Sequence, residues 1–173
     1  RQAMPDAVGD IARYPDGGGF ALKAALSRRH GVQMSQIVLG NGSNDVLDIA
    51  ARAFLARGNS AVYAQHAFAV YPIATLAVGA RGIEVAARDY GHDLDAMLAA
   101  ITPRTRVVFI ANPNNPTGTW ASSEAIDRFV SAVPRDVIVV LDEAYDDYLP
   151  EEGRSPSIGW TVRHPNLSFR ARS

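Results

Sequence analysis

The sequence has no cysteine among its 173 residues. Disulfide bridges, a thiolate nucleophile and cysteine-based zinc sites are therefore excluded, and this composition is typical of a reducing cytoplasm. Long hydrophobic runs are also lacking: apolar stretches such as residues 107–111 and 137–141 have the length of a strand and are far too short for a membrane span. We therefore expect a cytoplasmic protein without a membrane partner.

An excess of one charge is lacking as well. The 17 basic and 18 acidic residues give a net charge of -1, so the chain has no positive field for DNA or RNA, and nucleic acid is not an expected partner. Lysine is nearly absent, because Lys23 is the only lysine and every other basic residue is an arginine. A P-loop NTPase is excluded, since Lys23 lies in an unbroken helical pattern and not in a phosphate loop.

Short β-rich runs alternate with helical patterns along the chain. We expect strands at residues 37–39, 61–63, 83–86, 107–111 and 137–141, and helices at residues 19–30, 43–57, 70–79, 94–101 and 123–133. This alternation predicts a three-layer α/β/α fold with a mostly parallel sheet covered by helices on both faces. The runs 107–111 and 137–141 do not alternate with polar residues, so both faces of those strands should be buried. Ligands of such sheets bind beyond the carboxyl ends of the strands.

A glycine-rich turn with the sequence Gly40-Asn41-Gly42 precedes the second predicted helix. Glycines let the backbone turn tightly and approach a ligand, and Ser43 with the free amides of the first helical turn could bind a phosphate. Alternatively, Ser43 serves only as the N-cap of the helix. Asp45 suits the helix dipole but would repel a bound anion. The turn by itself leaves both interpretations open.

Asp142 comes directly after the apolar run 137–141 and should lie at the carboxyl end of a buried strand. An unpaired charge is costly there, so this carboxylate needs a cation. Mg²⁺ is one candidate, because apolar residues followed by Asp-Glu also describe a Walker B strand. The simplest alternative is an ion pair with one of the many arginines.

A third polar cluster, residues 112–118, follows the predicted strand 107–111. Its density of Asn, Pro and Gly forces a tight turn, and each of its X-Pro bonds is a candidate for a cis peptide. Two strand ends and one helix start would then converge on a single crevice. A phosphate-binding turn, a carboxylate and amide donors together indicate a phosphorylated aromatic cofactor better than a sugar or a metal ion.

In order and spacing, these motifs resemble those of the fold type I pyridoxal-phosphate-dependent aminotransferases. The matching segments are residues 13–15, 40–45, 112–118 and 142–145, and the resemblance extends from about Arg13 to Leu167. Within the superfamily, the segments are most similar to those of histidinol-phosphate aminotransferases. The resemblance implies pyridoxal 5'-phosphate as the cofactor, no metal, and the large domain of fold type I, here truncated.

The resemblance also implies where the phosphate and the ring of the cofactor would be bound. Ser43, Asn44 and Asp45 would hold the phosphate at the helix start. Phe68 would stack on the pyridine ring, for which only the face of its own ring is needed.

The remaining implied roles concern the substituents of the ring and the partner subunit. Asn115 and Tyr145 would donate to the phenolate oxygen of the cofactor. Asp142 would keep the pyridinium nitrogen protonated, so that the ring can take up the electron pair released from the substrate. The resemblance thus implies that Asp142 and Tyr145 are the catalytic residues of this chain. Tyr14 matches the tyrosine that reaches the cofactor phosphate of the neighbouring subunit, which implies a homodimer.

Transamination needs a lysine that forms a Schiff base with the cofactor and transfers the substrate proton. Family members carry it in a Ser-Lys pair after the strand that begins here near Leu167, and Lys23 lies on the wrong element to replace it. We therefore expect the chain to be a fragment that is inactive alone. In this interpretation residues 1–30 belong to a small domain and a dimer contact, and residues 31–173 form an incomplete cofactor-binding large domain.

The function implied for the parent protein is amino-group transfer between histidinol phosphate and 2-oxoglutarate in histidine biosynthesis. An aromatic amino acid aminotransferase is the first alternative, and a pyridoxal-phosphate-dependent decarboxylase or lyase is the next. From a different class, the chain could be a non-catalytic remnant that only binds the cofactor.

Overall fold

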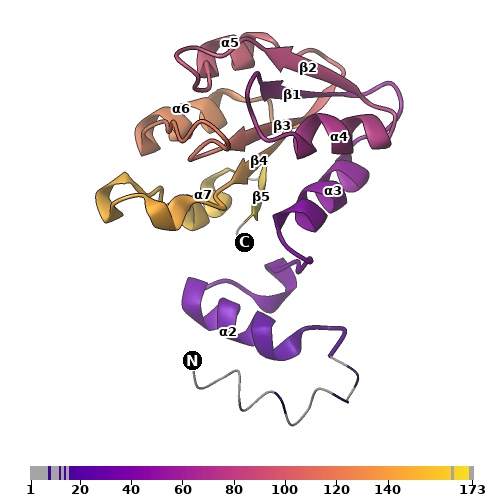
Figure 1. Cartoon of the computed structure of the whole chain (residues 1–173), viewed down its shortest axis with the longest axis vertical. Helices are drawn as coiled ribbons and strands as arrows, with labels where there is room; N and C mark the ends of the chain where they lie inside the picture. The colour runs from indigo at the N-terminus through magenta and orange to yellow at the C-terminus, as the bar shows by residue number, and fades with distance from the viewer. Residues whose placement is uncertain (1–7, 9–11, 13, 15, 165, 172–173) are drawn as a thin grey trace. The chain divides into compact units, whose positions relative to one another are not determined.

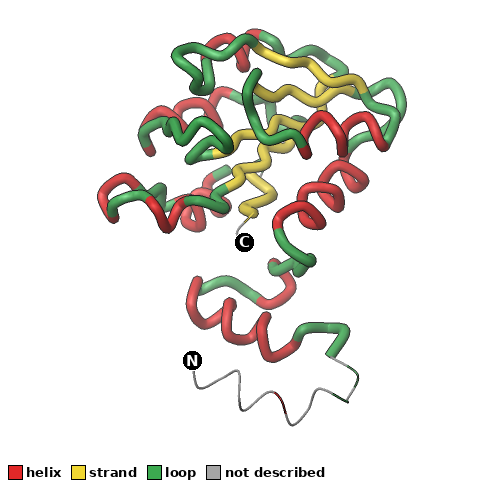
Figure 2. Tube along the Cα trace, in the orientation of Figure 1, coloured by secondary structure: helices red, strands yellow, loops and turns green. Residues whose placement is uncertain are grey.

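The computed structural model describes residues 8, 12, 14, 16–164 and 166–171 (Figure 1). The chain divides into two compact units, Arg1–Leu39 and Gly40–Ser173. Helices and strands alternate along the second unit, as Figure 2 shows. None of the helices in the described residues is both long and apolar enough to cross a membrane.

The first unit contains the helix α2 (Phe20–His30) and the short 3-10 helix η1 (Met34–Gln36). The carboxylate of Asp16 accepts hydrogen bonds from the backbone N–H groups of Gly18 (2.9 Å) and Phe20 (2.6 Å), and thereby holds the start of α2. The helix ends at Gly31, whose φ of 66° lies in the left-handed region that glycine adopts without strain.

The predicted strand at residues 37–39 is wrong. Ile37 has an extended backbone, but the segment pairs with none of the described strands, and the side chain of Val38 is 50% exposed. An apolar run of three residues forms a strand only where a neighbouring strand can accept its backbone hydrogen bonds.

The second unit contains a parallel sheet with the strand order β2-β1-β3-β4-β5. Its strands are β1 (Ser60–Ala64), β2 (Arg81–Val85), β3 (Thr105–Ala111), β4 (Ile138–Asp142) and β5 (Leu167–Ala171). The prediction of a largely parallel α/β sheet is therefore confirmed.

Because the chain leaves β1 toward β2 and then returns to the other side of β1, the order of the strands reverses between β1 and β3. Such a switch point is where open α/β sheets bind ligands.

Helices cover both faces of the sheet, which confirms the three layers (Figure 1). These helices are α3 (Ser43–Phe54), α4 (Val70–Ala77), α5 (Leu94–Ala99), α6 (Ser123–Ala132) and α7 (Ser157–Arg163). Helices α5, α6 and α7 pack through Met97, Ile126 and Trp160 into one hydrophobic core cluster. Helices α3 and α4 pack through Leu47 and Tyr71 into the other.

Strands β3 and β4 join the two clusters, because their successive side chains point to opposite faces. In β3, Val108 and Ile110 belong to the α5–α7 cluster, whereas Phe109 belongs to the α3–α4 cluster. The register pairs Ala111 with Asp142, so the two strands end side by side. Burial on both faces, as expected from the missing alternation, is confirmed.

We predict that Ile110→Ala destabilises the fold by about 2–5 kcal/mol, because the Ile110 side chain is fully buried and its truncation leaves a cavity in the core. The matched control is Ile73→Ala on α4, where the side chain is 63% exposed and the expected change is within about 0.5 kcal/mol. Urea unfolding of both variants measures the difference. Equal losses would contradict the packing described for β3.

Candidate functional site

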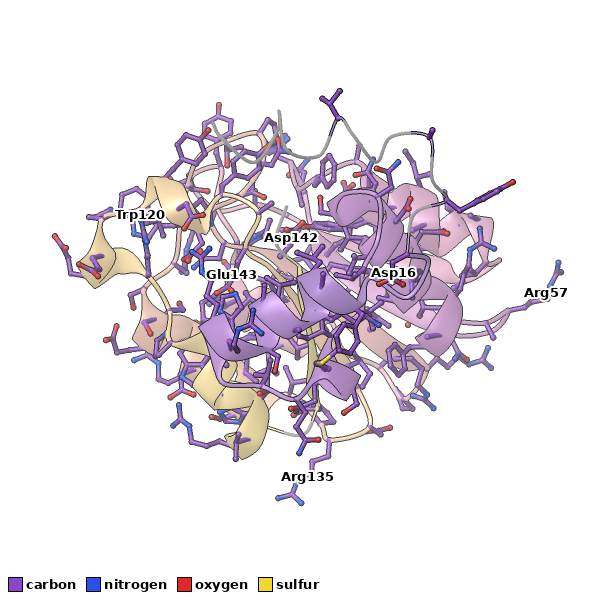
Figure 3. All side chains as sticks on the ribbon, turned by 90° about the horizontal axis from the view of Figure 1, so that it is seen from below. Asp16, Arg57, Trp120, Arg135, Asp142 and Glu143 are labelled. Atoms are coloured by element: carbon purple, nitrogen blue, oxygen red, sulfur yellow. The ribbon has the colours of Figure 1, made fainter. Side chains whose placement is uncertain are left out.

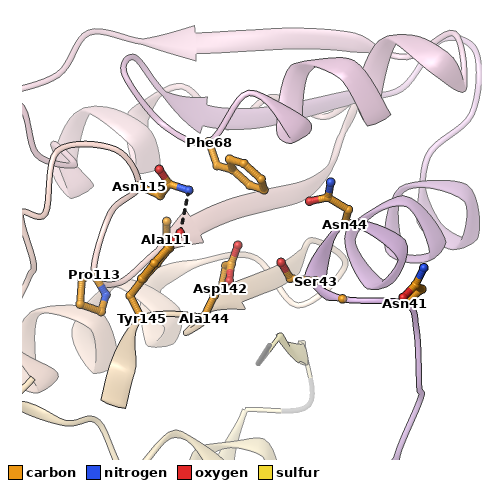
Figure 4. Close-up of a pocket in the computed structure, with 11 residues that line it drawn as sticks. Asn41, Ser43, Asn44, Phe68, Ala111, Pro113, Asn115, Asp142, Ala144 and Tyr145 are labelled. Carbon is orange, nitrogen blue, oxygen red and sulfur yellow. Dashed lines mark hydrogen bonds between the residues drawn. The ribbon is translucent and has the colours of Figure 1, made fainter. Parts of the chain in front are cut away.

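A cavity of about 340 Å³ opens where β3 and β4 end and α3 begins (Figure 4). The segments that line it are far apart in sequence. The lining residues are Asn41, Gly42, Ser43, Asn44, Phe68, Ala111, Pro113, Asn115, Asp142, Ala144 and Tyr145. Phe68 follows β1 and Ala111 ends β3, so the cavity lies at the switch point of the sheet.

The start of α3 is open on the cavity side. Gly42 is the N-cap residue, with φ at 81°, and it has no side chain that could bond to the first N–H groups of the helix. Ser43 is the first helical residue, so the interpretation of Ser43 as a mere N-cap is wrong. An uncapped helix start presents free N–H groups and the positive end of the helix dipole, which is favourable for an anion.

The turn before α3 depends on Gly40 and Asp45. A Cβ atom at Gly40 would lie 2.8 Å from the Cβ of Asp45, so a side chain at residue 40 would force the turn apart. The Asp45 carboxylate accepts a hydrogen bond from the backbone N–H of Asn41 (2.9 Å). This carboxylate therefore closes the turn, and Asp45 is not among the residues that line the cavity.

The Asp142 carboxylate is 5% exposed and has two hydrogen-bond donors. Tyr71 Oη donates to Oδ2 (2.9 Å), and the backbone N–H of Ala144 donates to Oδ1 (3.2 Å). Burial raises the pKa of Asp142 above its ordinary value, although both hydrogen bonds act in the opposite direction. The pKa of the Tyr71 hydroxyl is also raised, first by burial and then by the Asp142 charge, so Tyr71 keeps its proton and remains a donor.

The expected ion pair between Asp142 and an arginine does not form within the described residues. Arg57 and Arg135 project outward (Figure 3). Groups of three or more His, Cys, Asp or Glu that could hold a metal are absent from the described residues. The carboxylate instead faces the cavity.

The side chains around the cavity differ chemically from one side to the next (Figure 4). Phe68 lies on the side opposite Asp142, and Ser43 and Asn44 lie at one end. At the other end, Asn115 Nδ2 donates to Tyr145 Oη (3.4 Å), and Tyr145 is 43% exposed. The cavity thus offers an aromatic face, a carboxylate, a helix start and a pair of neutral donors.

The turn after β3 is held by the side chains of Asn112 and Asn114, which precede Asn115. The Asn112 side chain donates to the Ala121 carbonyl oxygen (3.2 Å) and accepts from the Ala121 N–H (2.8 Å), and Asn114 Nδ2 donates to the His66 carbonyl oxygen (3.1 Å). Both X-Pro bonds of the turn, Asn112-Pro113 and Asn115-Pro116, are cis. The hydrogen bonds of Asn112 and Asn114 hold the turn that carries Asn115.

Most of the predicted site residues come together in this cavity: Ser43, Asn44, Phe68, Asn115, Asp142 and Tyr145. Tyr14 belongs to the other unit, where its side chain is fully exposed, and its role toward a neighbouring subunit stays a prediction. Tyr71 was missed by the sequence reasoning. The sequence could have indicated the pairing of Tyr71 with Asp142, because a tyrosine on the apolar face of a helix needs a hydrogen-bond partner, and so does a buried carboxylate.

Asp142→Asn should change how the stability of the chain depends on pH. A carboxyl group whose pKa is raised on folding binds protons better in the folded chain, so its contribution makes stability fall as pH rises from the ordinary value of 3.8 through the raised pKa. Asp142→Asn should abolish this decrease in stability with rising pH, and its free energy of unfolding at pH 7 should be higher than that of the unsubstituted chain. Urea unfolding between pH 4 and 8 measures it, with Asp136→Asn at an exposed carboxylate as the control. An unchanged pH profile in Asp142→Asn would contradict the environment described for Asp142.

Comparison with known proteins gives consistent results. The model of the family described as aminotransferase class I and II matches residues 1–169. Histidinol-phosphate aminotransferase 2 of Nitrosospira multiformis is 62% identical over 95% of this chain, and histidinol-phosphate aminotransferase 1 of Thiobacillus denitrificans is 64% identical over 95%. The chain spans 42% and 43% of the length of these two relatives.

A solved structure has the same fold over nearly the whole of this chain. The histidinol-phosphate aminotransferase from Sinorhizobium meliloti, solved in complex with pyridoxal-5'-phosphate, superposes with a TM-score of 0.88 at 29% identity. The superposition covers 99% of this chain and 46% of that protein. Since the family match extends over almost every residue and the fold agrees with it, this chain belongs to the class I and II aminotransferases.

Proposed function

We propose that the protein containing this chain is a pyridoxal-phosphate-dependent aminotransferase and that the cavity at the ends of β3 and β4 binds the cofactor. The observation that carries the proposal is the buried Asp142 carboxylate, which faces a cavity with an aromatic wall and an open helix start. A carboxylate in this position needs a cationic partner, and a protonated pyridine nitrogen is one.

The donors and acceptors around the cavity fit this cofactor. The start of α3, with Ser43 and Asn44, suits a phosphate group. Phe68 offers an apolar ring face for an aromatic ring, and the Asn115–Tyr145 pair offers neutral donors for a phenolate oxygen. Asp45 would contribute through its backbone at the helix start, because its carboxylate is bonded to Asn41.

Pyridoxal phosphate, when bound, supplies an electron sink for the carbon that loses its proton. Asp142 would hold a proton on the ring nitrogen and thereby maintain that capacity. Asn115 and Tyr145 would donate to the phenolate oxygen, and Phe68 would orient the ring and exclude water from one of its faces. The catalytic residues proposed for this chain are Asp142 and Tyr145.

We further propose histidinol phosphate and 2-oxoglutarate as the substrates of the whole protein, in histidine biosynthesis. The support is the identity of 62% and 64% to two curated histidinol-phosphate aminotransferases. A cytoplasmic homodimer in which Tyr14 contacts the cofactor phosphate of the partner subunit belongs to the same proposal. So does the assignment of residues 31–173 to a cofactor-binding domain, with residues 1–30 in a small domain and a dimer contact. Lys23, in α2, is not proposed as the lysine that binds the cofactor.

Asp142→Ala should weaken noncovalent binding of pyridoxal phosphate to this chain by about tenfold or more, because a charge-assisted hydrogen bond is lost. Equilibrium dialysis with pyridoxal phosphate measures the affinity. The control is Asp136→Ala, which removes an exposed carboxylate paired with Arg106. Equal affinity of the Asp142→Ala variant and the unsubstituted chain would refute the pairing with the ring nitrogen.

The substrate is tested separately on the complete protein. We expect 2-oxoglutarate-dependent transamination of histidinol phosphate, with phenylalanine transaminated more slowly, in an assay that follows glutamate formation. Preference for phenylalanine would favour an aromatic amino acid aminotransferase. Absence of transamination for every amino donor would leave only the cofactor-binding part of the proposal.

A further inference from the structure

Tyr71 connects α4 to the end of β4 through a buried hydrogen bond. Its side chain has no solvent exposure, and its Oη donates to Asp142 Oδ2 at 2.9 Å. Tyr71 does not line the cavity, and the proposed function assigns it no role. It nevertheless contacts the residue on which that function depends.

The ring of Tyr71 is fixed by two other aromatic rings. It stacks on Phe109 of β3, with ring centroids 4.9 Å apart and an angle of 7° between the planes. It also meets Phe68 at 6.0 Å in an edge-to-face arrangement with an angle of 89°. Because the ring cannot easily move, the direction of the hydroxyl is determined by the packing.

The Asp142 carboxylate is held on both of its oxygens. Ala144 donates to Oδ1 through its backbone N–H, and Tyr71 donates to Oδ2 through its hydroxyl. The neighbouring acid, Glu143, is also buried but accepts from Ser157 Oγ (2.9 Å) at the start of α7. Loss of the Tyr71 hydroxyl would remove this donor from Oδ2 and leave the orientation of the carboxylate about χ2 to the weaker contact with Ala144.

We infer that Tyr71 is a positioning residue: its hydroxyl orients the Asp142 carboxylate toward the ring nitrogen of the cofactor, and its ring, packed edge-to-face with Phe68, supports that side chain on the opposite side of the cofactor ring. This inference rests on the proposed function, since it gives Tyr71 a role only in a site that binds an aromatic cation. The same side chain supports the two walls of the cavity that the ring would contact.

Tyr71→Phe separates this role from packing, because it removes the hydroxyl and keeps both ring contacts. The matched control is Tyr63→Phe in β1. Tyr63 is another buried tyrosine, and its hydroxyl lies against Gly82 and away from Asp142. A purely structural role for Tyr71 would alter the stability of the chain and leave the behaviour of Asp142 unchanged.

The first measurement needs no cofactor. The carboxyl carbon of Asp142, assigned by its loss in Asp142→Asn, is followed by NMR during a pH titration of the 173-residue chain. We expect Tyr71→Phe to raise the titration midpoint by about one pH unit, because the ionised form loses a hydrogen bond, whereas Tyr63→Phe leaves it in place. An unchanged midpoint in Tyr71→Phe would overturn the inference.

The second measurement is a double-mutant cycle on pyridoxal phosphate affinity. Tyr71→Phe should weaken binding about fivefold to tenfold when Asp142 is present and have no further effect in the Asp142→Ala background. Equal losses in both backgrounds would reduce Tyr71 to a packing residue. If the unsubstituted chain does not bind pyridoxal phosphate, the proposed function of the cavity fails, and the titration of Asp142 still decides whether Tyr71 controls this carboxylate.

Discussion

The burial of one carboxylate at the end of a parallel strand is the constraint on which the cavity depends. Asp142 is the last residue of β4, and removing its charge from water is unfavourable unless donors and a cation compensate. The fold provides the donors, from α4 and from the chain just after the strand. In the proposed function, the cation is the protonated ring nitrogen of the cofactor. A site of this kind stays energetically incomplete until it is occupied, which favours binding.

The arrangement of the sheet explains why the other groups are near this carboxylate. The strand order reverses between β1 and β3, so the segments after these strands diverge and leave a crevice. The aromatic residue after β1, the turn after β3 and the start of α3 all border this crevice. Each group is supplied by a different element, and side-chain hydrogen bonds hold the turn before α3 and the turn after β3. The cavity is therefore a property of the topology as much as of the residues.

The sequence predicted the strands with long apolar runs and the polar residues that follow them, because both are local signals. The three-residue strand at residues 37–39 was predicted wrongly, since pairing depends on a neighbour that the local pattern does not reveal. Ser43 was considered as an N-cap, although the conformation of Gly42 makes that glycine the cap. Tyr71 and Asp142 are 71 positions apart, so the sequence could indicate that each needs a partner, and the packed sheet and helices show that they pair with each other.

The pairing of β3 with β4 has one more consequence. Ala111 lies beside Asp142 in the ladder, and the backbone N–H of Asn112 donates to the Asp142 carbonyl oxygen (2.9 Å). Val140 faces α3 and α4, and Asp142, two residues later, faces the same way, whereas Leu141 faces α5–α7. A slip of β4 by a single residue would turn the carboxylate into the opposite apolar layer and present a leucine to the cavity. The presence of a carboxylate in the cavity thus depends on the register of β4, and a shift of about 3.3 Å along this strand would remove it.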